Sequence, residues 1–189
     1  MRTLNLRLVG NTPILLHRIC RHQEREEIAS VGSSNTSFLD EARDKMSKDQ
    51  DGNPVIPVSW FWDSLRAGCS RITVADKQLS FTRLQSIMRL PTDPLPLRQK
   101  NGGIPKCEEV YKSFQHAAPG SKGSIVVVAP LFRDWTAELS VVVSGELFPD
   151  NAGATSKTLE KIFLEAGKSG MGLFHPPKKH FGQFRISVK

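Results

Sequence analysis

Apolar and polar residues alternate at the start of the chain. Leu4, Leu6 and Leu8 are separated by polar side chains, the period of two that is typical of a strand with one buried face. The segment 10–13 (GNTP) follows directly and predicts the turn that ends this strand. From about 18 to 54 the chain is polar and highly charged, with no sustained apolar stripe, which predicts an insertion.

Helical spacing begins after Pro57, a residue suited to the first position of a helix, and Gly68 supplies a stop. The apolar residues that recur at this spacing are Val58, Phe61, Trp62 and Leu65. We expect the aromatic run 60–62 (WFW) to pack in the core or between subunits rather than to stack on bases.

The middle of the chain predicts strands and a second insertion. An apolar and basic alternation between Ile72 and Leu90 predicts one strand, and frequent proline and glycine predict an insertion at about 91–123 without long regular structure. The β-branched run 124–129 predicts a strand buried on both faces, and alternation over 137–143 predicts the next strand. The turn between them is expected within 130–135.

A second helix is predicted after a cap at Thr155 or Ser156, and Gly167 occupies the position of a left-handed C-terminal cap. Alternation over 184–188 predicts a final strand. The order β-α-β-β-α-β with two long insertions predicts an α+β, ferredoxin-like (RRM-like) sandwich that spans residues 1–189 as a single domain.

Charge favours a polyanionic partner. The chain has 26 Lys and Arg residues against 19 Asp and Glu residues, a formal net charge of +7, and such an excess attracts nucleic acid through counterion release. Cys20, Cys69 and Cys107 are odd in number and widely spaced, which indicates a reducing cytoplasm rather than a disulfide framework. No apolar run has the length of a membrane span.

Positive charge collects at the C-terminal end, where no acidic residue follows Glu165. Glycine recurs at 170, 172 and 182, and a residue without a Cβ lets backbone amides approach phosphate oxygens. Phe174 and Phe181 offer rings for stacking between the charges. This segment predicts a nucleic-acid contact, although a glycine-rich connector with a solvated basic rim would have the same composition.

Two segments carry a resemblance to a known family. The segment 55–66 (VIPVSWFWDSLR) resembles the "IPGSSLKGALR" motif that opens the first helix in the RAMP superfamily of CRISPR-associated proteins. The segment 170–186 is similar to the glycine-rich loop of that family, which ends in a "GFG" step before a strand. The chain departs from the family in its bulkier helix motif and in Pro176-Pro177 within the loop.

The resemblance implies a ferredoxin-like subunit that binds single-stranded guide RNA, oligomerises along it and contacts other effector subunits, without a cofactor. It places residues of the C-terminal loop and basic residues of the first insertion at the RNA. These residues are Lys168, Phe174, His175, Lys178, Lys179 and His180 in the C-terminal segment, and Arg18, Arg21, Arg25 and Arg43 in the insertion. Contacts of this kind position the phosphate backbone and carry no sequence information.

An endoribonuclease, a metal site and an assembly subunit are the alternatives to non-catalytic RNA binding. A RAMP-like endoribonuclease would need a general base and a cation, which His17, His22 or Tyr111 could supply with Lys178.

Metal chemistry has weaker sequence support. His17, Cys20 and His22 lack a fourth ligand, and Asp40, Glu41 and Asp44 are interleaved with basic residues as on a solvated face, so no metal is expected.

A phage-type or effector-complex assembly subunit would use exposed Trp60, Phe132 and Trp135 as its interface.

Overall fold

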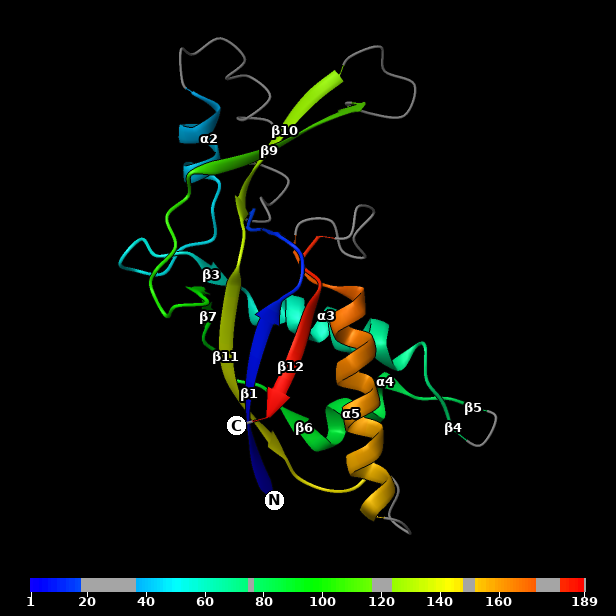
Figure 1. Cartoon of the computed structure of the whole chain (residues 1–189). Helices are drawn as coiled ribbons and strands as arrows, with labels where there is room; N and C mark the ends of the chain where they lie inside the picture. Colours follow the sequence, from blue (N-terminus) through cyan, green and yellow to red (C-terminus); the bar gives the residue numbers. More distant parts are fainter. Residues whose placement is uncertain (18–36, 75–76, 117–123, 148–151, 173–180, 189) are drawn as a thin grey trace.

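The computed structural model describes residues 1–17, 37–74, 77–116, 124–147, 152–172 and 181–188. The chain is a mixed α+β protein built around an antiparallel sheet (Figure 1). This sheet contains β1 (Arg2–Gly10), β11 (Trp135–Val143), β12 (Phe184–Val188) and β6 (Met88–Arg89) in the order β12-β1-β11-β6. A further short strand, β8 (Arg98–Gln99), pairs with the other end of β11.

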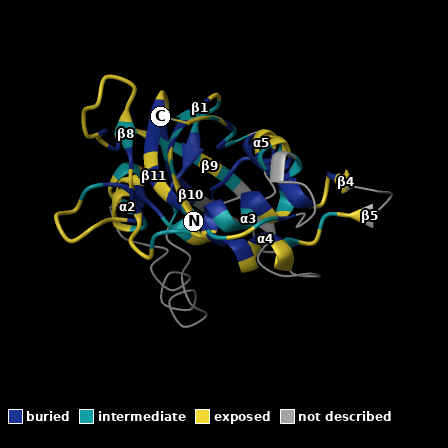
Figure 2. Cartoon of the chain, turned by 90° about the horizontal axis from the view of Figure 1, so that it is seen from below, coloured by how far each residue is buried: buried dark blue, intermediate teal, exposed yellow. Residues whose placement is uncertain are grey.

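Two long helices lie together on one side of the central sheet (Figure 1). They are α3 (Val58–Cys69) and α5 (Ala152–Ser169), and they cross closely at Gly68, where an added Cβ would lie 2.7 Å from the carbonyl oxygen of Ile162. Phe61 of α3 packs against Phe184 of β12 with ring centroids 6.2 Å apart. Figure 2 colours the chain by burial, and the buried residues of α3, α5 and the central strands belong to one hydrophobic core.

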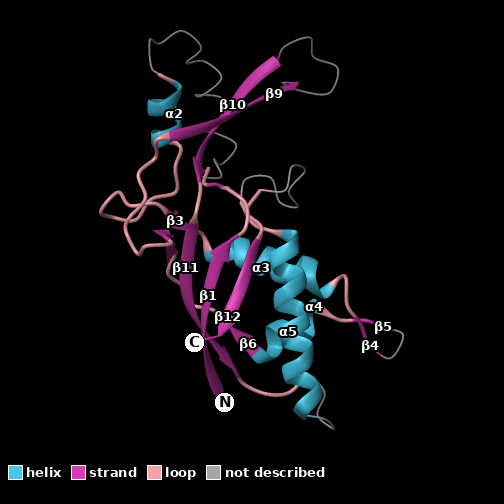
Figure 3. Ribbon diagram, in the orientation of Figure 1, coloured by secondary structure: helices cyan, strands magenta, loops and turns pink. Residues whose placement is uncertain are grey.

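A second, three-stranded sheet extends away from the first (Figure 3). It has the order β2-β10-β9, formed by β2 (Ile14–Leu15), β10 (Ser124–Phe132) and β9 (Glu109–His116), with helix α2 (Phe38–Asp44) packed along β9 and β10. Ser37 caps α2, because its side-chain oxygen accepts a hydrogen bond from the Asp40 amide at 3.2 Å. The two sheets are continuous through the chain, since β10 leads into β11 by a tight turn at Asp134, which has a φ of 49°.

The remaining elements are short. Helix α4 (Phe81–Ile87) precedes β6, strand β3 (Val55–Ile56) pairs with β7 (Leu95–Pro96), and β4 (Thr73–Val74) pairs with β5 (Lys77–Gln78). None of the helices in the described parts of the chain is both long and apolar enough to cross a membrane.

The periodic elements were predicted correctly, and the α+β class is confirmed. Strand β1, helix α3, helix α5 and strand β12 lie where the apolar spacing placed them. The aromatic run also packs as expected, because Trp60 and Phe61 are buried and Trp62 packs edge-on against Phe81 at 5.8 Å.

Several boundaries were wrong. The single strand expected between 72 and 90 is instead a short hairpin, a helix and β6, because Leu84 and Ile87 are both buried at the helical spacing of three. The second insertion contains most of β9 rather than irregular chain. Strand β10 runs through 130–132, so the expected turn is confined to Arg133 and Asp134.

Helix α5 begins earlier and ends later than predicted, because it starts at Ala152 and so contains Thr155 and Ser156, the expected caps. Gly167 is inside the helix, and Gly170, with φ of 74°, is the residue in the left-handed conformation. Gly167 has a different role, because an added Cβ would lie 2.1 Å from the carbonyl oxygen of Phe184. Glycine is required there by the close approach of β12 to the helix.

Candidate nucleic-acid interface

The turn between β1 and β2 holds the end of the C-terminal loop. The amides of Asn11 and Thr12 donate to the Gln183 carbonyl at 2.8 and 3.3 Å, and the Gln183 amide donates to the Thr12 hydroxyl at 2.9 Å. The indole Nε1 of Trp135 donates to the Thr12 carbonyl at 2.8 Å. The turn is therefore fixed from two sides, by β12 and by the buried start of β11.

Both described ends of the loop meet at this turn. The Met171 amide donates to the Gly182 carbonyl at 3.1 Å, and the Gly182 amide donates to the Pro13 carbonyl at 2.7 Å. The Ser64 hydroxyl of α3 donates to the Gly170 carbonyl. The residues on either side of segment 173–180 (LFHPPKKH) are thus bonded to each other, and the segment itself lies outside the described residues.

Three glycines make these anchors possible. Gly170, Gly172 and Gly182 have φ values of 74°, 126° and 64°, in the region that favours glycine. An added Cβ on Gly172 would lie 3.2 Å from the Leu15 carbonyl oxygen, so the loop passes close to β2. At these positions glycine permits a close approach of protein backbone, and its expected approach to phosphate oxygens stays a prediction.

An aromatic pair lies beside the loop. The ring of Tyr111 on β9 packs edge-on against Phe181, with centroids 5.0 Å apart and planes at 67°. Tyr111 pairs with Ala129 of β10. On the other side of β10, the Leu16 amide donates to the Pro130 carbonyl at 3.1 Å. When this antiparallel register is continued by one residue, His17 comes opposite Ala129. His17 also forms an isolated bridge with Met46 and is half-buried.

Of the ten predicted RNA-binding residues, the structure describes Arg43 and Lys168. The other predicted contacts lie outside the described residues, as does the alternative catalytic residue His22. They are Arg18, Arg21, Arg25, Phe174, His175, Lys178, Lys179 and His180.

Arg43 and Lys168 are not brought together. Arg43 is exposed on α2, where its Nε donates to the Cys107 carbonyl at 3.3 Å and its Nη1 pairs with Asp40 at 3.3 Å. Lys168 is exposed in the last turn of α5 and its Nζ pairs with Glu165 at 2.6 Å. The two helix ends lie well apart in Figure 1, so they cannot contact the same phosphate. Lys168 stands beside the loop, since the Gln183 side chain donates to its carbonyl at 2.9 Å.

Sequence reasoning missed a cation on the extended sheet. Lys112 of β9 is exposed, and its Nζ lies 3.7 Å from the ring centroid of Phe38 on α2, a cation–π contact. It was missed because β9 itself was not predicted. An alternation of exposed Lys112 with half-buried Tyr111 and Ser113 is the signal that could have found it.

The carboxylates of α2 form ion pairs rather than a metal site. Asp40 pairs with Arg43, and Glu41 pairs with Lys45 one helical turn on, as expected for a solvated charged face. Within the residues that the structure describes, no group of three His, Cys, Asp or Glu side chains could hold a metal ion. Cys20 and His22 of the sequence trio lie outside those residues.

The aromatic interface of the assembly-subunit hypothesis is wrong. Trp60, Phe132 and Trp135 are 4%, 3% and 1% exposed, so none of them is available to a partner. Their burial has a simple cause, because each lies on the side of its element that faces the main core.

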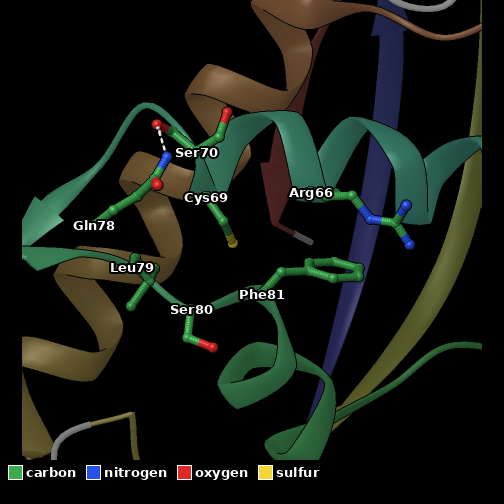
Figure 4. A pocket seen from close by; sticks show the side chains of 7 residues that line it. All are labelled: Arg66, Cys69, Ser70, Gln78, Leu79, Ser80 and Phe81. Carbon is green, nitrogen blue, oxygen red and sulfur yellow. Dashed lines mark hydrogen bonds between the residues drawn. The ribbon is translucent and has the colours of Figure 1, made fainter.

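A shallow open hollow of about 270 Å³ lies between the end of α3 and the start of α4 (Figure 4). The Arg66 guanidinium stacks over the Phe81 ring at 4.8 Å, and the Gln78 amide donates to the Ser70 carbonyl. Burial raises the pKa of Cys69 to about 11, so this thiol is protonated at neutral pH. Cys69 is therefore not an activated nucleophile in this hollow.

Neither a protein-family model nor a curated protein matches the chain.

Proposed function

We propose that the chain is a non-catalytic RNA-binding subunit of a CRISPR-type ribonucleoprotein, working in the cytoplasm, and that its fold is ferredoxin-like. The strand order supports this fold. Along the chain, β1, β6, β11 and β12 are the first to fourth strands of a β-α-β-β-α-β unit, and in the sheet they lie in the order 4-1-3-2. Helices α3 and α5 follow the first and third of these strands, as that unit requires.

One observation carries the RNA proposal. The two described ends of the C-terminal segment are bonded to each other through Met171 and Gly182, and the second end is bonded to the β1–β2 turn through Gly182 and Gln183. Between these anchors the sequence contains Lys178, Lys179 and two histidines but no acid. An anchored basic loop presents its cations from a fixed base. It therefore loses less conformational entropy on binding a phosphate backbone than a free tail would.

Filter binding of single-stranded RNA across a salt series tests this proposal. The charge-reversal pair Lys178→Glu with Lys179→Glu is expected to weaken binding by about 10-fold or more and to reduce the magnitude of the log–log salt slope by about 1–2. The matched control is Lys157→Glu with Lys161→Glu, which makes the same charge change at two exposed positions on α5. Wild-type protein that binds no RNA, or equal losses in both pairs, would contradict the proposal.

The endoribonuclease is a second candidate, favoured by the position of Tyr111 against Phe181 and by His17, which follows β2 in the three-stranded sheet that also contains the strand of Tyr111. A metal-independent ribonuclease would use such groups as base or acid near the scissile phosphate. Labelled RNA incubated with excess protein and a chelator separates the candidates. Cleavage that is lost in His17→Ala would establish the enzyme, whereas intact RNA with retained binding supports the non-catalytic subunit.

A further inference from the structure

The side of the central sheet that faces away from α3 and α5 is basic. The strand register defines this open face, because Leu4, Leu6 and Leu8 pair with buried residues of β11 on the helix side, and the residues between them point the other way. The described residues of the open face are Thr3, Asn5, Arg7 and Val9 of β1, Thr136, Glu138, Ser140 and Val142 of β11, Arg185 and Ser187 of β12, Arg89 of β6 and Arg98 of β8.

The charges on this face do not cancel. Four arginines are present with one acid, Glu138, whose carboxylate is 4.0 Å from Arg7 Nε, at the outer limit of an ion pair. Arg7 Nε is buried and has no hydrogen-bond partner among the described residues. Arg98 is partly offset by Asp49, whose pKa is lowered by the Asn53 backbone hydrogen bond and, to a smaller extent, by the charge of Arg98. Glu138 offsets part of the charge of Arg7, so the face keeps a net positive charge to which Arg7, Arg89 and Arg185 contribute.

Arg7 and Arg185 are diagonal neighbours on this face. Arg7 pairs with Ser187 and Val9 pairs with Arg185, so the two arginine Cα atoms are separated by about 7–8 Å. Arg185 is exposed and lies three residues after Gly182, at the start of the strand that leaves the C-terminal loop. The basic part of the face thus begins where the anchored loop ends.

The chemistry of the face selects the part of the ligand that it would contact. Its described residues include no aromatic side chain, so the face offers no aromatic ring on which bases could stack. It offers guanidinium groups, which match phosphate geometry, together with hydroxyl and amide groups such as Ser140, which donates to the Asn5 side chain at 2.8 Å. A phosphate backbone fits this surface better than a splayed base does.

We propose that the open face of the central sheet carries the phosphate backbone of the RNA onward from the C-terminal loop, through Arg185 to Arg7, without reading its sequence. This inference rests on the proposed function and extends it from one loop to a track across the sheet. Longer RNA would then bind more tightly than RNA that fills only the loop.

The double variant Arg7→Gln with Arg185→Gln tests the track. The matched control is Arg71→Gln with Arg83→Gln, which removes two exposed arginines from α4 and the end of α3. Binding is measured with homopolymeric RNA of ~5 and ~20 nucleotides across a salt series. We expect the double variant to lose about 10-fold in affinity for the longer RNA and roughly 1 in salt slope, with little change for the shorter one.

Each outcome separates the two proposals. If the wild type binds no RNA, both fail. If the wild type binds and the Lys178 and Lys179 reversal weakens it, but the sheet variant matches its control, only the track is overturned. A sheet variant that binds RNA normally but loses an acidic protein partner would assign the face to protein and also overturn the track. If the double variant melts at a lower temperature than the wild type, the single variant Arg185→Gln, at an exposed position, replaces it. Its salt slope is expected to fall by about half as much as that of the double variant.

Discussion

The anchoring of the C-terminal loop can be tested at Gly182. This residue has a φ of 64°, its amide donates to Pro13, and its carbonyl accepts from Met171. An added Cβ would lie 1.7 Å from the Met171 carbonyl oxygen and 3.0 Å from the Met171 nitrogen. These are backbone atoms, so a rotamer change cannot relieve the overlap.

The cost of Gly182→Ala has three parts. The left-handed conformation costs an alanine about 1–2 kcal/mol. Separating the two chain segments to admit the methyl group adds about 1–3 kcal/mol, and weakening the hydrogen bonds to Pro13 and Met171 adds roughly 0.5–1.5 kcal/mol each. We therefore expect Gly182→Ala to destabilise the fold by about 3–8 kcal/mol.

The control isolates the steric part. Gly102 has a φ of 89°, and an added Cβ there would meet nothing within 4 Å. Gly102→Ala should cost about 1–2 kcal/mol from backbone conformation alone. Urea denaturation and thermal melts give both values, and at about 2–4 °C per kcal/mol Tm should fall by roughly 6–32 °C for Gly182→Ala against about 2–8 °C for the control. Equal shifts would refute the close contact between the two loop ends.

Two further predictions concern α3. Ser64→Ala leaves the buried Gly170 carbonyl without its donor and should lower the free energy of unfolding, measured by urea denaturation, by about 1–2 kcal/mol. The control Ser70→Ala, at an exposed hydroxyl, should change it by less than about 0.5 kcal/mol, and equal values would contradict the anchor. Because the pKa of Cys69 is raised to about 11, roughly one Cys69 side chain in a thousand is a thiolate at pH 8. Alkylation of Cys69, located by mass spectrometry, should therefore be at least about 100-fold slower in native than in unfolded protein. Fast labelling of the native protein would contradict the burial of Cys69.

Periodicity predicted the elements that have enough length to show it. In β1 and α5 the apolar residues repeat over 9 and 18 residues, so their faces could be assigned from the sequence. Helix α4 has 7 residues, of which Leu84 and Ile87 are buried, and a pair at a spacing of three is too little to separate a helix from an irregular strand. Pairing partners were also beyond the sequence, because the apolar run in β10 fits either sheet equally well.

The candidate site was predictable in composition but not in geometry. Glycine at 170, 172 and 182 and the one-signed charge were visible in the sequence. The sequence could not show that Gly167 is needed for the approach of Phe184 while Gly170 ends the helix, because both suit a helix C-terminus. It also could not show that Trp135 supports the β1–β2 turn, since a hydrogen bond to Thr12 joins residues more than 120 positions apart.

The anchoring groups and the expected RNA contacts are different residues, and this separation is what makes the functional tests decisive. The loop is held by backbone groups of Met171, Gly182 and Gln183 and by the side chains of Ser64 and Thr12, none of which lies between 173 and 180. Charge reversal at Lys178 and Lys179 therefore removes none of the described anchors. A loss of RNA affinity in that variant, with an unchanged melting curve, would measure lost contacts rather than a displaced loop. Gly182→Ala does the opposite, since it disturbs the base of the loop without replacing any basic residue.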